Sequence, residues 1–220
     1  MITRLYLVRH GATPLTAEDR FSGADGVDLS DEGRAQAERL AARLAGQGIT
    51  AIYSSPLSRA METARAIARG AGLGDPHVVD GLWEIGHGHW EGLRRSEVEA
   101  RFPEEYAMWS QDPFTFAPAG GESGVAVLTR ALPAIREIVK AHEGTGVLVV
   151  SHKATIRLLL SSLLGIDPRG YRDRLDQAPA CLNILDFSDL VRARLALFND
   201  TSHYEICPGL PGRHLSKWWS

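Results

Sequence analysis

The sequence predicts an α/β protein in which parallel strands alternate with helices. Three apolar runs carry this prediction, at residues 5–8, 51–53 and 147–150, and each precedes residues with helical spacing. A strand that is followed by a helix and then by another strand is typical of a parallel sheet, because the helix returns the chain to the same end. The carboxyl ends of parallel strands lie at one edge of the sheet, so we expect the residues after the three runs to meet there.

Length and composition fit one globular unit. The chain has 220 residues, 44% of them hydrophobic, which suffices for one domain or one domain with a lid. A net charge of −3 gives no support to nucleic-acid binding, which requires a basic face. Cys181 and Cys207 are too few for a disulfide framework. The sequence predicts neither a signal peptide nor a transmembrane helix, so we expect a cytoplasmic protein.

The first apolar run ends at Arg9, His10 and Gly11. This predicts a buried strand that delivers a cation and an imidazole to the sheet edge. Gly11 removes a side chain where the chain must turn and where a ligand could approach the backbone. A guanidinium can bind two oxygens of an anion and a neutral imidazole can attack phosphorus, so the pair suits a phosphoryl group. The alternative is a strand that ends in ordinary surface polar residues.

The other two runs bring further charge to this edge. After the second run, Ser55 and Pro56 are typical of a helix N-terminus, with Ser55 as the cap. Arg59 then lies near the positive end of the helix dipole, which is unfavourable for a cation unless an anion binds there. His152 follows the third run. Two arginines and two histidines thus predict a pocket for a dianion: Arg9, His10, Arg59 and His152.

Residues 13–23 are rich in turn-forming residues, which predicts a loop. Within this loop, Arg20 could reach back over the pocket or be a solvated surface residue. Ser30 is a good N-cap for a helix that ends near Gly46 or Gly48.

Glu84 is the candidate general acid. It lies between Trp83 and Ile85, and burial beside apolar side chains favours the protonated carboxyl that a general acid needs. His87 and His89 form an H-x-H pair that could face one way on a strand and bind a metal, but no third ligand follows at suitable spacing. We therefore expect His87 to contact the substrate rather than a metal.

Residues 94–119 form the candidate cap. They are aromatic and interrupted by prolines, which predicts two short helices and a loop. This insertion could cover the pocket or serve only as peripheral packing. Residues 120–123 return the chain to the sheet and start a helix that should run to about His142, with a kink at Pro133.

The remaining chain completes one domain. Lys153 either adds charge to the pocket or pairs with a nearby acid. Residues 182–187 and 191–198 predict a β-hairpin. We assign residues 1–204 to a single domain and residues 205–220, which include Trp218 and Trp219, to a C-terminal tail.

Five motifs occur in an order that matches one known family: Leu7-Val8-Arg9-His10-Gly11, Ser54-Ser55-Pro56-Leu57-Ser58-Arg59-Ala60, Glu84 with Gly88-His89-Trp90-Glu91-Gly92, Gly120-Gly121-Glu122-Ser123, and Ser151-His152. In this combination the chain resembles the histidine phosphatase superfamily, also called phosphoglycerate-mutase-like. The resemblance covers nearly the whole chain up to about residue 204.

The resemblance implies a three-layer α/β/α sandwich with a mostly parallel sheet. It also implies a mechanism in which His10 attacks phosphorus and becomes a phosphohistidine. Glu84 would protonate the leaving oxygen, and water would then hydrolyse the intermediate. Arg9, Arg59 and His152 would hold the phosphoryl oxygens. The implied reaction needs no metal and no cofactor, because side chains supply the positive charge.

Three positions depart from the family pattern. Thr16 stands where asparagine is common, Ser22 where glutamine is common, and Lys153 where a small residue is usual. None of these departures removes a core catalytic group. The candidate substrate-binding residues are Thr16, Arg20, Ser22, Gly23, His87 and Lys153.

The sequence is compatible with three functions. We favour a metal-independent phosphatase of the histidine acid phosphatase type, because residues 88–92 have the form of the phosphatase branch. The second candidate is a cofactor-dependent phosphoglycerate mutase, and the third is a non-catalytic binding module on the same fold. Intact His10, Glu84 and His152 argue against the third. We expect the partner to be a small phosphorylated metabolite rather than nucleic acid or a membrane, and the chain could form a homo-oligomer.

Overall fold

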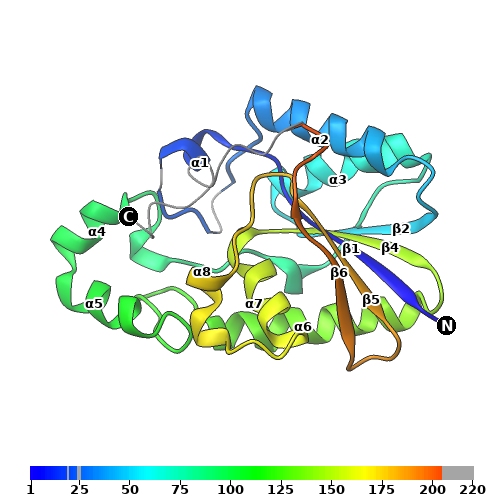
Figure 1. Ribbon diagram of the computed structural model, residues 1–220. Helices are drawn as coiled ribbons and strands as arrows, with labels where there is room; N and C mark the ends of the chain where they lie inside the picture. Colours follow the sequence, from blue (N-terminus) through cyan, green and yellow to red (C-terminus); the bar gives the residue numbers. More distant parts are fainter. Residues whose placement is uncertain (19, 24–25, 205–220) are drawn as a thin grey trace.

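A six-stranded mixed sheet forms the centre of the protein (Figure 1). The computed structural model describes residues 1–18, 20–23 and 26–204. The predicted C-terminal tail at residues 205–220, with Cys207, Trp218 and Trp219, lies outside the described residues.

The strand order in the sheet is β3-β2-β4-β1-β5-β6. Strand β4 pairs in parallel with β1 and β2, and β2 pairs in parallel with the short edge strand β3. Strands β5 and β6 are antiparallel and form the predicted hairpin at the other edge. The prediction of a mostly parallel sheet is therefore confirmed. The strands are β1 (Thr3–Arg9), β2 (Ile49–Ser54), β3 (His77–Val78), β4 (Gly146–Ser151), β5 (Leu182–Phe187) and β6 (Ala193–Asp200).

Helices cover both faces of the sheet, which gives the predicted three layers (Figure 1). Helices α2 (Asp31–Leu44) and α3 (Ser58–Ala71) pack on one face, and α6 (Gly124–Ala141) and α7 (Lys153–Leu163) pack on the other. The central parallel strands β1 and β4 are buried on both faces, which explains why they are continuous apolar runs rather than alternating ones.

Strand β1 shows how one apolar run supplies both cores. Leu5 and Leu7 pack against α6 and α7, whereas Tyr6 and Val8 pack against α2 and α3. Successive side chains of a strand point to opposite faces, so a run without polar residues is required where both faces are covered. The polar residues begin only where the strand leaves the sheet.

The cap consists of α4 (Arg95–Arg101) and α5 (Pro103–Gln111), so the two short helices expected within residues 94–119 are present. Its aromatic residues form a small core of their own, to which Phe21 contributes from the segment after β1. The ring of Phe21 lies 5.5 Å from that of Trp109. The cap is thereby packed against the segment that follows β1 and His10. The buried members of this core are Phe21, Trp90, Val98, Tyr106 and Trp109.

Two expectations about local structure are wrong. The predicted loop at residues 13–23 contains a short helix, α1 (Pro14–Glu18). It forms because the Oγ1 of Thr16 accepts the backbone N–H of Thr13 at 3.1 Å, which satisfies the donor at the helix start. Helix α3 begins at Ser58 and not at Ser55. The backbone N–H of Ser55 still pairs with the carbonyl of Val150, so the sheet edge extends to this residue.

The histidine pair also differs from expectation. His87 and His89 lie at the short 3-10 helix η2 (Gly88–Trp90) and not on a strand. Pro133 lies inside α6, and the helix continues through it. In the part of the chain that the structure describes, none of the helices has the length and apolar character needed to cross a bilayer. The remaining elements are η1 (Asp80–Leu82), η3 (Pro168–Gly170) and α8 (Tyr171–Arg174).

Candidate active site

The sheet edge brings His10 and His152 together. Arg9 is the last residue of β1 and pairs in register with Ser151, the last residue of β4, so the histidine that follows each strand emerges at the same place. The two imidazole ring centres are 5.1 Å apart. Both side chains are buried. Two residues 142 positions apart in the sequence therefore share one site because parallel strands end together.

Hydrogen bonds define which nitrogen of His10 is available. Its Nδ1 lies 2.7 Å from the carbonyl oxygen of Gly11, which can only accept, so Nδ1 carries the proton. Nε2 then holds the lone pair, and the Nε of Arg59 donates to it at 3.3 Å. The ring is thus held with its unprotonated nitrogen toward the arginine, as a nucleophile requires.

Burial and neighbouring charges keep both histidines neutral. Burial, followed by the positive charges of Arg9 and Arg59, lowers the pKa of His10 well below its usual value of 6.5. Burial also lowers the pKa of His152 well below 6.5, with His10 and the arginines as further causes. A neutral imidazole at physiological pH can act as a nucleophile or accept a proton.

The two arginines are buried with the histidines. Arg59 lies in the first turn of α3, and its Nη2 donates to the carbonyl of Gly23 at 2.7 Å. The Nη1 of Arg9 donates to the carbonyl of Gln177 at 2.7 Å, while its buried Nε has no hydrogen-bond partner among the described residues. An unsatisfied buried guanidinium donor is costly unless an oxyanion binds there. This arrangement suits the oxygens of a phosphoryl group.

Ser55 has a different role from the one expected. Its Oγ lies 2.7 Å from the Nε2 of His152, so it orients the second histidine instead of capping α3. The Nδ1 of His152 is buried without a hydrogen-bond partner in the described chain. That nitrogen therefore has a hydrogen-bonding position left to satisfy.

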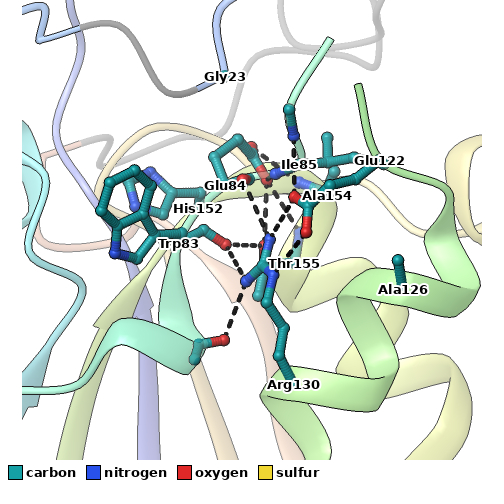
Figure 2. Close-up of polar contacts among 12 residues, drawn as sticks. Gly23, Trp83, Glu84, Ile85, Glu122, Ala126, Arg130, His152, Ala154 and Thr155 are labelled. Carbon is teal, nitrogen blue, oxygen red and sulfur yellow. Dashed lines mark hydrogen bonds and ion pairs between the residues drawn. The ribbon is translucent and has the colours of Figure 1, made fainter. Parts of the chain in front are cut away.

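Glu84 is buried beside these residues, and hydrogen-bond donors surround its carboxylate (Figure 2). Its Oε2 accepts the backbone N–H of Ala154 at 3.1 Å. Its Oε1 accepts the N–H of Thr155 at 3.1 Å and the Thr155 hydroxyl at 3.2 Å. These donors lie at the start of α7, where backbone N–H groups have no acceptor within the helix. These bonds fix the orientation of the Glu84 carboxyl at the start of α7, directly after His152.

Arg130 and Glu122 support Glu84, and the sequence did not indicate Arg130. The guanidinium of Arg130 binds Glu122 with both ends of its fork and also donates to the Glu84 carbonyl at 3.1 Å. Glu122 belongs to a recognised motif, but Arg130 is an ordinary helical residue in the sequence. Its partner Glu84 is 46 residues away, so no local spacing could have identified it.

Two glycines near the site are needed for close packing. A Cβ on Gly11 would lie 2.4 Å from the carbonyl oxygen of Gly33, and a Cβ on Gly33 would lie 2.0 Å from that of Ala12. The first turn of α2 therefore touches the segment after His10 directly. This backbone contact is a sufficient reason for a glycine at position 11.

Two candidate substrate-binding residues, Thr16 and Arg20, are less buried than the histidines and arginines of the site. Thr16 is exposed, and its hydroxyl bonds to Thr13 within α1. The Nη1 of Arg20 donates to the carbonyl of Gly92 at 2.8 Å and lies 3.6 Å from Glu97 on α4. Arg20 therefore connects the segment after β1 to the cap.

The other candidates lie closer to the buried residues. Gly23 accepts from Arg59 through its carbonyl, and its N–H donates to Glu91 Oε2 at 2.7 Å. His87 donates its N–H to the other oxygen of Glu91 at 2.8 Å, and burial lowers the pKa of its ring. The Nζ of Lys153 lies 3.8 Å from Asp176 Oδ1, so the nearby acid of the second alternative is present. Ser22 is half-buried beside Gly23.

Among the described residues, no group of three or more histidine, cysteine, aspartate or glutamate side chains could hold a metal ion. His89 instead lies 3.1 Å from Glu105 on α5, so it connects η2 to the cap.

The protein is an α/β sandwich that gathers neutral histidines, buried arginines and a carboxyl group at one edge of its sheet. This arrangement is typical of the class of proteins that bind a phosphoryl group. Comparison with known proteins identifies the family within this class. A model of the histidine phosphatase superfamily, branch 1, matches residues 5–201, and the chain belongs to this superfamily.

Curated relatives include phosphatases. A bifunctional protein of Mycobacterium tuberculosis is 40% identical over 202 residues, which cover 91% of this chain and 55% of that protein. The chain thus spans about half the length of this relative. Phosphoserine phosphatase 1 of Hydrogenobacter thermophilus is 36% identical over 76% of this chain and 78% of its own. A glucosyl-3-phosphoglycerate phosphatase of Mycolicibacterium vanbaalenii is 38% identical over 75% of this chain and 76% of its own.

Solved structures have the same fold. A Bacillus stearothermophilus protein superposes with a TM-score of 0.84 and 33% identity over 92% of this chain and 100% of that chain. The native mycobacterial glucosyl-3-phosphoglycerate phosphatase superposes with a TM-score of 0.82 and 30% identity over 90% of this chain and 99% of that chain.

Proposed function

We propose that this protein is a metal-independent phosphatase that hydrolyses a small phosphomonoester through a phosphohistidine on His10. The observation that carries the proposal is the state of His10. Its Nδ1 proton is held by the Gly11 carbonyl, and its Nε2 lone pair faces Arg59 at 3.3 Å. A neutral, oriented imidazole beside a buried cation has the chemistry needed to attack a phosphoryl group. The relatives named as phosphatases support the same function.

The first step forms the phosphohistidine. Arg9, Arg59 and His152 bind the oxygens of the phosphoryl group and stabilise its negative charge in the transition state. The Nε2 of His10 forms a bond to phosphorus, and the bond from phosphorus to the alcohol oxygen breaks. Glu84 gives a proton to that oxygen, so the alcohol leaves in neutral form.

The second step releases phosphate. A water molecule then attacks the phosphorus of the phosphohistidine. Glu84 takes a proton from this water, because the first step left its side chain as a carboxylate. The bond between phosphorus and Nε2 breaks, and His10 returns to its neutral state. Inorganic phosphate is the second product.

The cap and the candidate substrate-binding residues would determine which alcohol group of a phosphomonoester the site accepts. Thr16, Arg20, Ser22, Gly23, His87 and Lys153 remain our proposed substrate contacts. Phosphoserine and glucosyl-3-phosphoglycerate are the first substrates to test, because relatives are named for them. In both, the phosphate is attached to an alkyl oxygen, which is a poor leaving group without a proton donor.

The proposal is tested by phosphate release in the presence of a chelator. The panel contains p-nitrophenyl phosphate, phosphoserine, glucosyl-3-phosphoglycerate and 3-phosphoglycerate. His10→Ala should abolish release, whereas His77→Ala, which removes an exposed histidine on β3, should leave it unchanged. A rapid quench should trap an acid-labile phosphoprotein in the wild type that is absent from His10→Ala.

Two outcomes would contradict the proposal. Isomerisation of phosphoglycerate that depends on a bisphosphate primer, without net phosphate release, would instead identify a mutase. Release that survives His10→Ala would exclude a phosphohistidine at this residue.

A further inference from the structure

Arg130 uses its whole guanidinium to fix the loop that carries Glu84. The Nε and Nη2 of Arg130 bind the two carboxylate oxygens of Glu122 at 2.9 and 2.8 Å. The three remaining N–H donors go to backbone carbonyls: Nη1 to Gly81 at 2.9 Å and Trp83 at 2.8 Å, and Nη2 to Glu84 at 3.1 Å (Figure 2). A guanidinium has five N–H donors, and all five have acceptors here.

Glu122 holds the other end of the same loop. Its Oε2 accepts the N–H of Gly86 at 3.1 Å, and its backbone N–H donates to the Gly86 carbonyl at 2.8 Å. The loop from residue 81 to residue 86 is therefore tied on both sides of Glu84. Gly81 allows the close approach, because a Cβ there would lie 2.7 Å from the carbonyl oxygen of Arg130.

The two halves of Glu84 are held by different elements. Helix α6 fixes its backbone through Arg130, and the start of α7 fixes its carboxyl through Ala154 and Thr155, with a further bond to Oε1 from the N–H of Ile85 at 2.9 Å. The Thr155 hydroxyl lies between the two, 2.6 Å from the carbonyl oxygen of Trp83 and 3.2 Å from Glu84 Oε1, and its single proton is available to either acceptor. A shift of the backbone would move the carboxyl away from these donors.

We propose that Arg130 and Glu122 form a positioning pair that holds Glu84 where it protonates the leaving oxygen. This inference rests on the proposed phosphatase function. Arg130 acts on Glu84 through the backbone carbonyl oxygen of Glu84. The pair can therefore influence the position of the Glu84 carboxyl without contact between either residue and the substrate. A small displacement of a proton donor is enough to lower a rate substantially. The pair thereby determines how well the enzyme acts on phosphate esters of alkyl alcohols.

Leaving groups of different basicity separate this role from a structural one. Departure of p-nitrophenolate needs little help from a proton donor, whereas departure of an alkoxide needs it strongly. We expect Arg130→Gln to lower kcat/KM for phosphoserine by about 10-fold or more and that for p-nitrophenyl phosphate by less than about 3-fold. Glu84→Gln should show the same asymmetry with a larger loss. In the double variant the losses should not multiply, because both changes remove the same function.

Two further variants control for folding. Glu122→Gln keeps the shape of the side chain, removes its charge and should show the same asymmetry as Arg130→Gln. Arg69→Gln breaks an exposed arginine–glutamate pair between α3 and α2, in which Arg69 Nη2 lies 2.6 Å from Glu38, and should leave both activities unchanged. Equal losses on the two substrates in Arg130→Gln and Glu122→Gln would mean a merely structural role and would overturn the inference.

A second measurement needs no substrate. The N–H groups of Ala154 and Thr155 bond to Glu84, so their hydrogen exchange should lose protection in Arg130→Gln and not in Arg69→Gln. Unchanged protection would overturn the inference even if the wild type released no phosphate. Asymmetry in Glu84→Gln without asymmetry in Arg130→Gln would leave the proposed function standing and refute only this inference.

Discussion

The Nε of Arg59 donates to the Nε2 of His10 across 3.3 Å, so a cation occupies the lone pair of the candidate nucleophile. The other ring nitrogen is protonated and bonded to Gly11. In the proposed reaction, Arg59 transfers its bond from Nε2 to a phosphoryl oxygen before the attack begins. One guanidinium would thus orient the free imidazole and then bind the substrate.

Arg59→Gln should lower kcat/KM by about 10²–10³-fold, because a charged donor to the phosphoryl group is lost. The pKa of His10 should rise, since the positive charge of Arg59 is one of the causes that lower it. It should nevertheless stay below 6.5, because burial is the largest cause. NMR titration of the ring protons measures this shift. A pKa that stays constant in the variant would refute the proposed electrostatic contact.

The acid limit of activity should lie well below pH 6.5. A lowered pKa keeps the His10 imidazole neutral and nucleophilic at pH values where an ordinary histidine is protonated. A phosphate monoester itself titrates at about pH 6. The value of kcat/KM therefore has to be calculated with the concentration of the dianionic substrate and not with its total concentration. This corrected value should stay level from pH 7 through 6.5. A fall of the corrected kcat/KM centred at pH 6.5 would contradict this prediction. If NMR titration then showed that His10 does not titrate at this pH, the acid limit would belong to another group.

Acid should destabilise the fold through the same two histidines. Above pH 6.5 the imidazoles of His10 and His152 are neutral in the folded and the unfolded chain. Below 6.5 the unfolded chain binds protons that the folded chain does not, since both folded pKa values are lowered. The free energy of unfolding should therefore fall with pH by up to about 1.4 kcal/mol per unit for each histidine.

Denaturant unfolding between pH 7 and 5 measures this dependence. His152→Gln should reduce the slope by up to about 1.4 kcal/mol per pH unit, because one of the two buried titrating groups is removed. His77→Ala, at an exposed position, serves as the matched control. A slope that is the same in His152→Gln and in the wild type would contradict the assignment.

Gly33→Ala should destabilise the protein by about 1–3 kcal/mol, because the new Cβ would lie 2.0 Å from the carbonyl oxygen of Ala12 and force the backbone to move. Activity should fall as well, since the displaced segment follows His10. Gly74→Ala is the control: no atom lies within 4 Å of its Cβ position, so its effect should be within about 0.5 kcal/mol. Thermal unfolding and phosphate release measure both variants. Equal stability of the two would refute the proposed contact.

The sequence by itself determined the sheet and the position of the site at its edge. Uninterrupted apolar runs identify strands buried on both faces, and the polar residues that end those runs identify the edge where parallel strands finish. His10 and His152 could be brought together on this basis alone. Ser30 was also predictable as a helix cap, since its hydroxyl accepts the N–H of Gly33 only three residues away.

Only the tertiary structure decided how the site residues are held. Ser55 looked like a helix cap in sequence, but its hydroxyl binds His152, which is 97 residues away. Gly11 is required by the approach of Gly33 from another element. Arg130 carries no local signal, and its acceptors come from the loop at residues 81–84 and from Glu122. Side-chain hydrogen bonds depend on distances of a few tenths of an ångström between elements that pack together, whereas a sequence pattern records only which face of an element is apolar.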